Sequence, residues 1–121
     1  MQKTDILIIS GKLPSLNEYI AAMNRNRYVG GKMKKQYTDL ITWECKLQHL
    51  KKNSEPVEII FNWYEKNKKR DKDNVAFAKK FILDGMVKAG ILDNDGWKNY
   101  GDFQDRFYID KNNPRIEVEL L

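Results

Sequence analysis

The chain has 121 residues, the size of one domain, and we expect a single domain over residues 1–121. Its one cysteine excludes an internal disulfide, and no apolar run approaches the roughly 20 residues that span a bilayer, so we expect a soluble, cytoplasmic protein without a membrane partner. The net charge of +5 is uneven, because residues 1–70 hold 14 Lys and Arg against 7 Asp and Glu, whereas residues 71–121 hold 8 against 10. This distribution favours a polyanion as partner, although an ordinary basic protein is the alternative.

The first half of the chain predicts one strand, one irregular stretch and one helix. Residues 6–10 form a short β-branched run, which is typical of a strand. Residues 11–19 are rich in turn formers. Residues 20–34 are polar and basic and contain a Gly-Gly pair, which predicts a loop or short irregular element. From residue 35 to residue 50, apolar side chains recur every three or four positions, as in an amphipathic helix.

The second half predicts a strand, a helix and two further strands. Residues 57–65 alternate apolar and polar side chains, as a strand does. A helix over residues 73–89 carries an apolar stripe and ends before Gly90. After a loop, residues 103–110 and 115–121 have the pattern of strands. This order indicates an α+β fold, with a small mixed or antiparallel sheet of about four strands packed with two main helices.

The acidic residues on either side of the second helix suggest a metal site. Asp71 and Asp73 would point the same way if the chain is extended there, and Asp73 would also begin the helix. The alternative is that Asp73 is only a helix cap. Asp93 and Asp95 lie in the loop beyond the helix, and spacing alone does not tell whether this loop folds back toward Asp71. If it does, three carboxylates would bind Mg²⁺, which activates water for phosphodiester cleavage.

Cations accompany these acids. Lys68, Lys69 and Arg70 directly precede the first acidic pair, where they offset its charge and can bind flanking phosphates. Lys80 lies four residues before Asp84 on the predicted helix. A lysine at that place would stabilise the charge that develops on phosphorus during cleavage, or it would simply form a surface ion pair with Asp84.

Several segments resemble the RusA family of Holliday junction resolvases, and together they run over nearly the whole chain. The R-D-x-D-N motif lies at residues 70–74, and a helix with a lysine and Asp84 follows it. Lys-Ala-Gly-Ile at residues 88–91 and an acidic turn at residues 93–95 match the next family segments. Upstream, residues 13–19 are similar to the family's P-P-S-x-N-x-Y segment, and parts of residues 28–37 are similar to the segment after it.

The resemblance implies a homodimer, dependence on Mg²⁺ with Mn²⁺ able to substitute, and paired symmetric nicks across a four-way DNA junction in recombination and repair. The implied metal ligands, which are also catalytic, are Asp71, Asp73 and Asp95. Asp93 is the alternative third ligand, because Asn94 stands where the family has an aspartate. Lys80 is the best match to the catalytic lysine, with Lys79 as the alternative. The residues implied to contact DNA are Arg70, Lys69, Lys68, Asn17, Lys32 and Lys34.

Two other functions fit the same sequence. The first is a catalytically inactive protein that binds branched DNA through the same surface. The second is an unrelated domain whose acidic patch has no nucleic-acid partner. Salt dependence separates the second from the others, because phosphate contacts make affinity fall steeply with salt.

Overall fold

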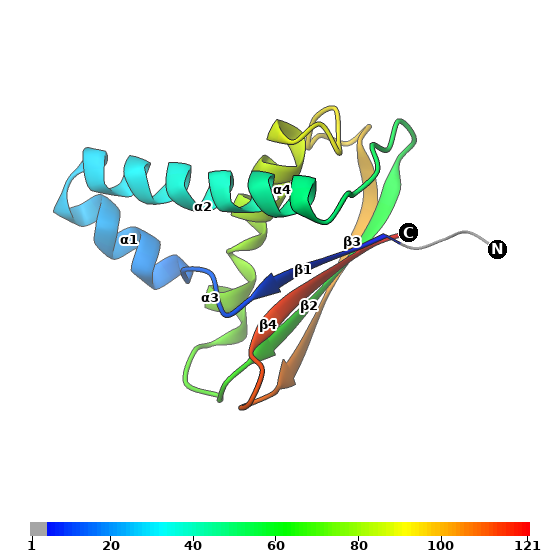
Figure 1. The fold of residues 1–121 in the computed structure, drawn as a ribbon. Helices are drawn as coiled ribbons and strands as arrows, with labels where there is room; N and C mark the ends of the chain where they lie inside the picture. The colour runs from blue at the N-terminus through cyan, green and yellow to red at the C-terminus, as the bar shows by residue number, and fades with distance from the viewer. Residues whose placement is uncertain (1–4) are drawn as a thin grey trace.

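A mixed sheet and four helical elements make up the protein, which is known from a computed structural model that describes residues 5–121. In chain order the elements are β1 (Asp5–Ser10), α1 (Leu16–Arg25), α2 (Arg27–Leu47), β2 (Val57–Glu65), α3 (Lys72–Ala76), α4 (Lys79–Lys88), β3 (Tyr100–Ile109) and β4 (Arg115–Leu120). Figure 1 shows the helices on one side of the sheet. The predicted α+β class is therefore confirmed. Within the described residues, none of the helices combines the length and the apolar character that crossing a bilayer requires.

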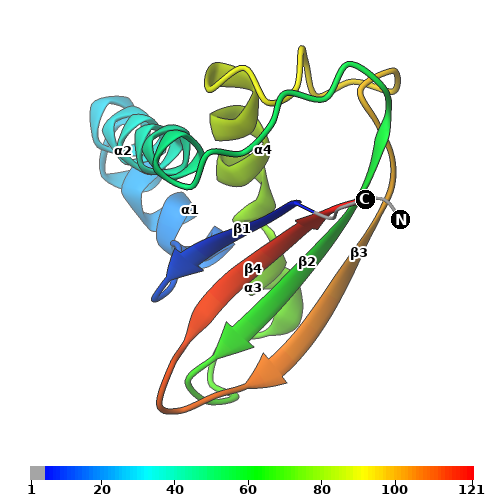
Figure 2. The ribbon, with the colours of Figure 1, turned by 45° about the vertical axis from the view of Figure 1, so that its right-hand side comes forward.

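The sheet has the strand order β1-β4-β2-β3 (Figure 2). β4 pairs antiparallel with both β1 and β2, with Ile9 opposite Ile116 and Phe61 opposite Val118. β2 and β3 are parallel, and α3 and α4 form the crossover between them, as a parallel pair requires. This crossover carries all the residues predicted to be catalytic, which are Asp71, Asp73, Lys80 and Asp95.

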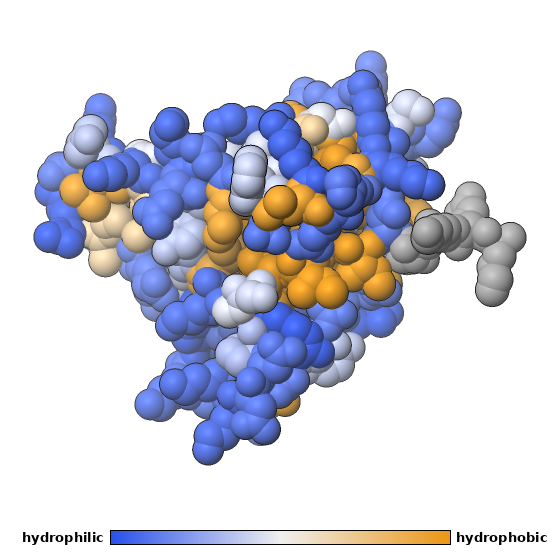
Figure 3. All heavy atoms as spheres, in the orientation of Figure 1, coloured by the Kyte–Doolittle hydropathy of each residue, from blue (hydrophilic) through white to orange (hydrophobic). Residues whose placement is uncertain are grey.

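The core lies between the inner face of the sheet and the helices. Period-two alternation on β2 sends Phe61 and Trp63 inward, where both are fully buried. Ile41 on α2 and Met86 on α4 are also fully buried. Figure 3 shows apolar side chains between α2 and the sheet. The hydrophobic face of each element therefore has a partner in one continuous core.

The prediction of a loop over residues 20–34 was wrong, because α1 and the first turns of α2 occupy it. The local cause is an N-cap. The side chain of Ser15 accepts a hydrogen bond from the backbone N–H of Glu18 at 3.2 Å, and this begins α1. Gly30 is buried where the two helices meet and serves their close packing, whereas Gly31 is exposed, and neither glycine breaks the helix.

The predicted helix over residues 73–89 is two shorter helices. α3 ends at Ala76 and α4 begins at Lys79. Between them the backbone tightens, because the N–H of Ala78 bonds to the carbonyl of Val75 and the N–H of Lys80 bonds to that of Phe77. The helical phase therefore shifts at this point, and residues before and after it no longer share one continuous face.

Candidate functional site

Three charged side chains, Lys34, Asp84 and Asp95, gather around Lys80, and we call these four residues the Lys80 cluster. The Nζ of Lys80 lies 3.1 Å from Asp84 Oδ1 and 3.4 Å from Asp95 Oδ2. Lys34 reaches the other oxygen of Asp84, at 3.9 Å, from α2. The hydrogen bond that Lys80 donates to Asp84, together with the charge of Asp95, raises the pKa of Lys80. The lysine therefore stays protonated at neutral pH, and its side chain is 52% exposed.

The neighbouring Lys79 points to a different place. Its ammonium forms an ion pair with Asp105 on β3 and lies 4.1 Å from the centre of the Phe103 ring. Asp105 also accepts a hydrogen bond at 2.9 Å from the indole nitrogen of Trp63, which is buried. Lys79 therefore holds α4 against β2 and β3. Of the two lysines considered from the sequence, Lys80 is the one beside Asp95.

Asp93 and Asp95 also differ in their surroundings. Asp93 forms an ion pair with Lys52 at 3.2 Å, and none of its ion pairs within residues 5–121 involves Lys80. Asp95 contacts Lys80 instead, with 3.4 Å between Asp95 Oδ2 and the Nζ of Lys80. The loop is held by turn hydrogen bonds, such as the one from the N–H of Gly96 to Asn99 Oδ1 at 3.1 Å. The position of Asp95 thus follows from a structured turn.

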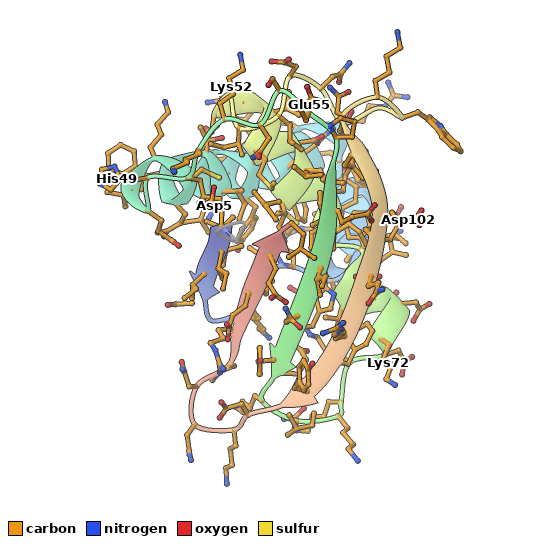
Figure 4. The ribbon with its side chains drawn as sticks, turned by 90° about the vertical axis from the view of Figure 1, so that its right-hand side faces the viewer. Asp5, His49, Lys52, Glu55, Lys72 and Asp102 are labelled. Atoms are coloured by element: carbon orange, nitrogen blue, oxygen red, sulfur yellow. The ribbon has the colours of Figure 1, made fainter. Side chains whose placement is uncertain are left out.

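Asp71 and Asp73 lie at the start of α3. The expectation that they share one face was based on an extended chain, but helix begins at Lys72, so side chains two positions apart diverge. The helix cap is Asp71, not Asp73, and its side chain makes no capping hydrogen bond. Both aspartates are exposed. In Figure 4, Lys72 lies beside the lower part of β3, whereas Asp102 lies on its upper part.

Two of the predicted metal ligands, Asp71 and Asp95, lie near opposite ends of β3. Asp71 lines a surface hollow with residues 107–109, whereas Asp95 lines another with residues 100–104. The middles of these strand segments are about 20 Å apart at the usual rise per residue. Across residues 5–121, no three or more His, Cys, Asp or Glu side chains are grouped so that they could hold a metal ion. As placed, these residues do not fit a ready-made Mg²⁺ site, and the three-carboxylate site stays a prediction.

The side chain of Arg70 is mostly buried and bonds to other residues of the protein. Its guanidinium donates two hydrogen bonds to the carboxylate of Glu65, at 2.8 and 3.0 Å, and one to the carbonyl of Leu13 at 2.9 Å. Burial opposes its charge, but the hydrogen bonds and charge of Glu65, with a smaller effect of Glu18, raise the pKa of Arg70. Arg70 therefore ties the end of β2 to the segment before α1. Its predicted contact with DNA would have to be made from this position.

The remaining residues expected to contact DNA are all exposed. Lys68 and Lys69 lie in the turn after β2, and Asn17 is in the first turn of α1. Lys32 and Lys34 are on α2, where Lys34 joins the Lys80 cluster. The cations thus occupy two separate places, one beside Asp71 and one on α2.

Sequence reasoning missed Asp105. The available signal was its place on β3, where it alternates with Phe103 and Phe107 and so falls on the inner face of the sheet. A charged residue at an inward position needs a partner, and the partner is Lys79. Which lysine fills that role could not be read from spacing.

Comparison with known proteins adds no assignment: the chain matches no protein-family model, and no curated protein matches its sequence.

Proposed function

We propose that this chain is a divalent-metal-dependent endonuclease that cuts four-way DNA junctions with paired nicks, acting as a homodimer in the cytoplasm. The observation that supports this most is the contact between Lys80 and Asp95, 3.4 Å apart and fifteen residues apart in sequence. The resemblance to RusA resolvases implies one active site for these two residues. A two-fold dimer would supply one such site for each of the two cuts.

The chemistry of the Lys80 cluster suits a phosphodiester substrate. A protonated, half-exposed lysine beside a solvent-accessible surface can pair with a phosphate oxygen and with the charge that develops on it. Asp84 holds the lysine in place, because both are on α4 at the i,i+4 spacing. Asp95 contributes a carboxylate from the adjoining turn. The metal dependence in this proposal comes from the family resemblance.

The decisive experiment uses a labelled synthetic four-way junction in Mg²⁺ and in Mn²⁺. Asp73→Asn and Asp95→Asn should abolish nicking while they keep or improve junction binding, because each removes a negative charge near phosphate. Glu55→Gln is the matched control, since Glu55 is exposed in the segment just before β2 and its substitution removes the same charge (Figure 4). Nicking that survives both aspartate substitutions, or an inactive wild type, would reject the nuclease.

The second candidate is a branched-DNA-binding protein without catalytic activity. It is favoured by the absence, within residues 5–121, of any group of three or more possible metal-ligating side chains. It predicts tight junction binding without nicks in either metal. Titration of Mn²⁺ followed by its electron paramagnetic resonance separates the two, because only the nuclease requires ions to bind at Asp71, Asp73 and Asp95.

A further inference from the structure

The part of the α1–α2 hairpin around its turn carries a charge equal to the net charge of the whole chain. Residues 19–38, which we call the hairpin arm, contain no Asp or Glu and five cations: Arg25, Arg27, Lys32, Lys34 and Lys35. The rest of the chain carries 17 Lys and Arg against 17 Asp and Glu and is therefore neutral. Solubility does not require such a separation, because surfaces with both signs mixed are also soluble. The arm is thus the part of the chain that attracts a polyanion.

The hairpin arm is a packed element that extends away from the sheet (Figures 1 and 2). Asn26 ends α1 and caps α2, where its side chain accepts a hydrogen bond from the N–H of Val29 at 2.8 Å. Gly30 lets the helices approach closely, because a Cβ there would lie 2.0 Å from the Sδ of Met23. The cations of the arm are therefore held on a defined scaffold.

The cations nearest the turn have no internal counter-ion. Arg25, Arg27 and Lys32 are exposed, and none of the ion pairs within residues 5–121 involves them. Tyr28 lies among them and is 75% exposed. Figure 3 shows a mostly hydrophilic surface at this end of the molecule. An external anion is the partner that these side chains lack.

The arm also leads to the Lys80 cluster. Lys34 on α2 lies 3.9 Å from Asp84, which lies 3.1 Å from Lys80. Arg27 is seven residues before Lys34 on α2, so the two side chains lie on the same face of the helix. A rod of negative charge that lies along this face would therefore pass from the exposed Arg27 to Lys80.

We infer that the hairpin arm binds the phosphate backbone of a DNA duplex that leads away from the Lys80 cluster. This inference rests on the proposed function. Cations without acids among them suit phosphates, and contacts of this kind fix the position of a duplex without reading its sequence. Each phosphate contact releases counter-ions, so the arm makes binding strongly dependent on salt.

The test compares two triple variants that lose the same charge. Arg25→Gln, Arg27→Gln and Lys32→Gln neutralise the arm, whereas Lys46→Gln, Lys51→Gln and Lys111→Gln remove three exposed cations elsewhere. Binding of a labelled duplex of about 30 base pairs and of a four-way junction is followed by anisotropy between about 50 and 200 mM salt. The arm variant should lose about two to three units from the slope of log K against log salt, and the control should lose less than about one.

Equal slopes for the two triple variants would overturn the inference and leave the proposed function standing, as long as the junction is still bound and nicked. A wild type that binds neither DNA would reject the proposed function and this inference together. Tighter binding of the wild type to vesicles with anionic lipid than to duplex, lost in the arm variant, would assign the arm to a membrane surface instead.

Glutamine keeps helix propensity close to that of Lys and Arg, so circular dichroism should show α1 and α2 intact in the arm variant. If that triple variant unfolds, Arg27→Gln and Lys46→Gln alone repeat the comparison. Their slopes should then differ by about 0.9. Equal slopes for this pair would also overturn the inference.

Discussion

Lys80 and Asp95 are in contact at 3.4 Å, whereas the adjacent Lys79 forms its ion pair with Asp105 on β3. Two neighbouring lysines thus have separate roles. Lys79 and Asp105 have side chains that are 19% and 21% exposed and belong to the packing of α4 on the sheet. Lys80 is 52% exposed and open to a ligand. This difference predicts opposite effects of removing each of them.

Lys80→Ala should lower junction nicking by about 100-fold, because it removes a charge that would stabilise the transition state. Its stability should change by no more than about 0.5 kcal/mol, since half-exposed ion pairs contribute little. Lys79→Ala should show the reverse: a loss of about 1–3 kcal/mol, because Asp105 is left without its partner, and normal nicking by the folded fraction. Nicking assays and urea titrations of both variants test these assignments. Loss of nicking in Lys79→Ala alone would move the catalytic role to Lys79.

Arg70 and Glu65 form a two-pronged ion pair that lysine cannot reproduce. Arg70→Lys should therefore lower the free energy of unfolding by about 1.5–3 kcal/mol, since both side chains are mostly buried. Arg106→Lys is the matched control, because Arg106 is exposed and bonds only to Gln104 among the described residues. The midpoints of urea denaturation measure the stability of both variants. Equal midpoints would mean that the pair contributes nothing to stability.

Gly85 and Gly31 are both helical but have opposite surroundings. A Cβ on Gly85 would lie 2.4 Å from the Cβ of Ile41 and 3.0 Å from the carbonyl oxygen of Thr38, so Gly85→Ala should cost about 1–3 kcal/mol. A Cβ on Gly31 would meet nothing within 4 Å, so Gly31→Ala should stabilise by about 0.4–1 kcal/mol. Thermal unfolding of the two variants should show midpoints that move in opposite directions. A destabilised Gly31→Ala would mean that the hairpin arm is packed differently.

The features best predicted from the sequence are those that depend only on residues close together in the chain. The alternation in β2 identified its inward residues, and the i,i+4 spacing on α4 correctly suggested the pair between Lys80 and Asp84. The hairpin arm was mispredicted because basic residues and a Gly-Gly pair concealed two capped helices. The cap was readable in the Ser15–Glu18 spacing, but the packing of Gly30 on Met23 was not, because it depends on how the two helices meet.

For a related reason, the candidate site could be predicted only in part from the sequence. The contact between Lys80 and Asp95 needs the turn after α4 to fold back along that helix, which no periodicity encodes. The separation of Asp71 from Asp95 needs the length and direction of β3, which come from its parallel pairing with β2. Spacing along the chain fixes which residues share an element, whereas distances between elements depend on the sheet topology.

Cys45 lies in the core on α2, and the residue is 1% exposed. Burial, with a smaller effect from the charge of Glu44, raises the pKa of this thiol from 9.0 to about 12. The thiolate is the reactive form, so the native protein at pH 8 should react with a thiol reagent only as fast as it unfolds. A complete reaction in guanidinium is the control. Rapid labelling of the native state would show that Cys45 is accessible.

The same shift makes stability depend on pH. Below about pH 9 the thiol is protonated in both states and the folded protein keeps its full stability. Between about pH 9 and pH 12 the unfolded chain loses the proton while the folded chain retains it, so stability falls by up to about 1.4 kcal/mol per pH unit. Cys45→Ala removes this group, so its unfolding free energy should fall less steeply above pH 9. Parallel curves for the two proteins would mean that Cys45 ionises in the folded state as readily as in the unfolded chain.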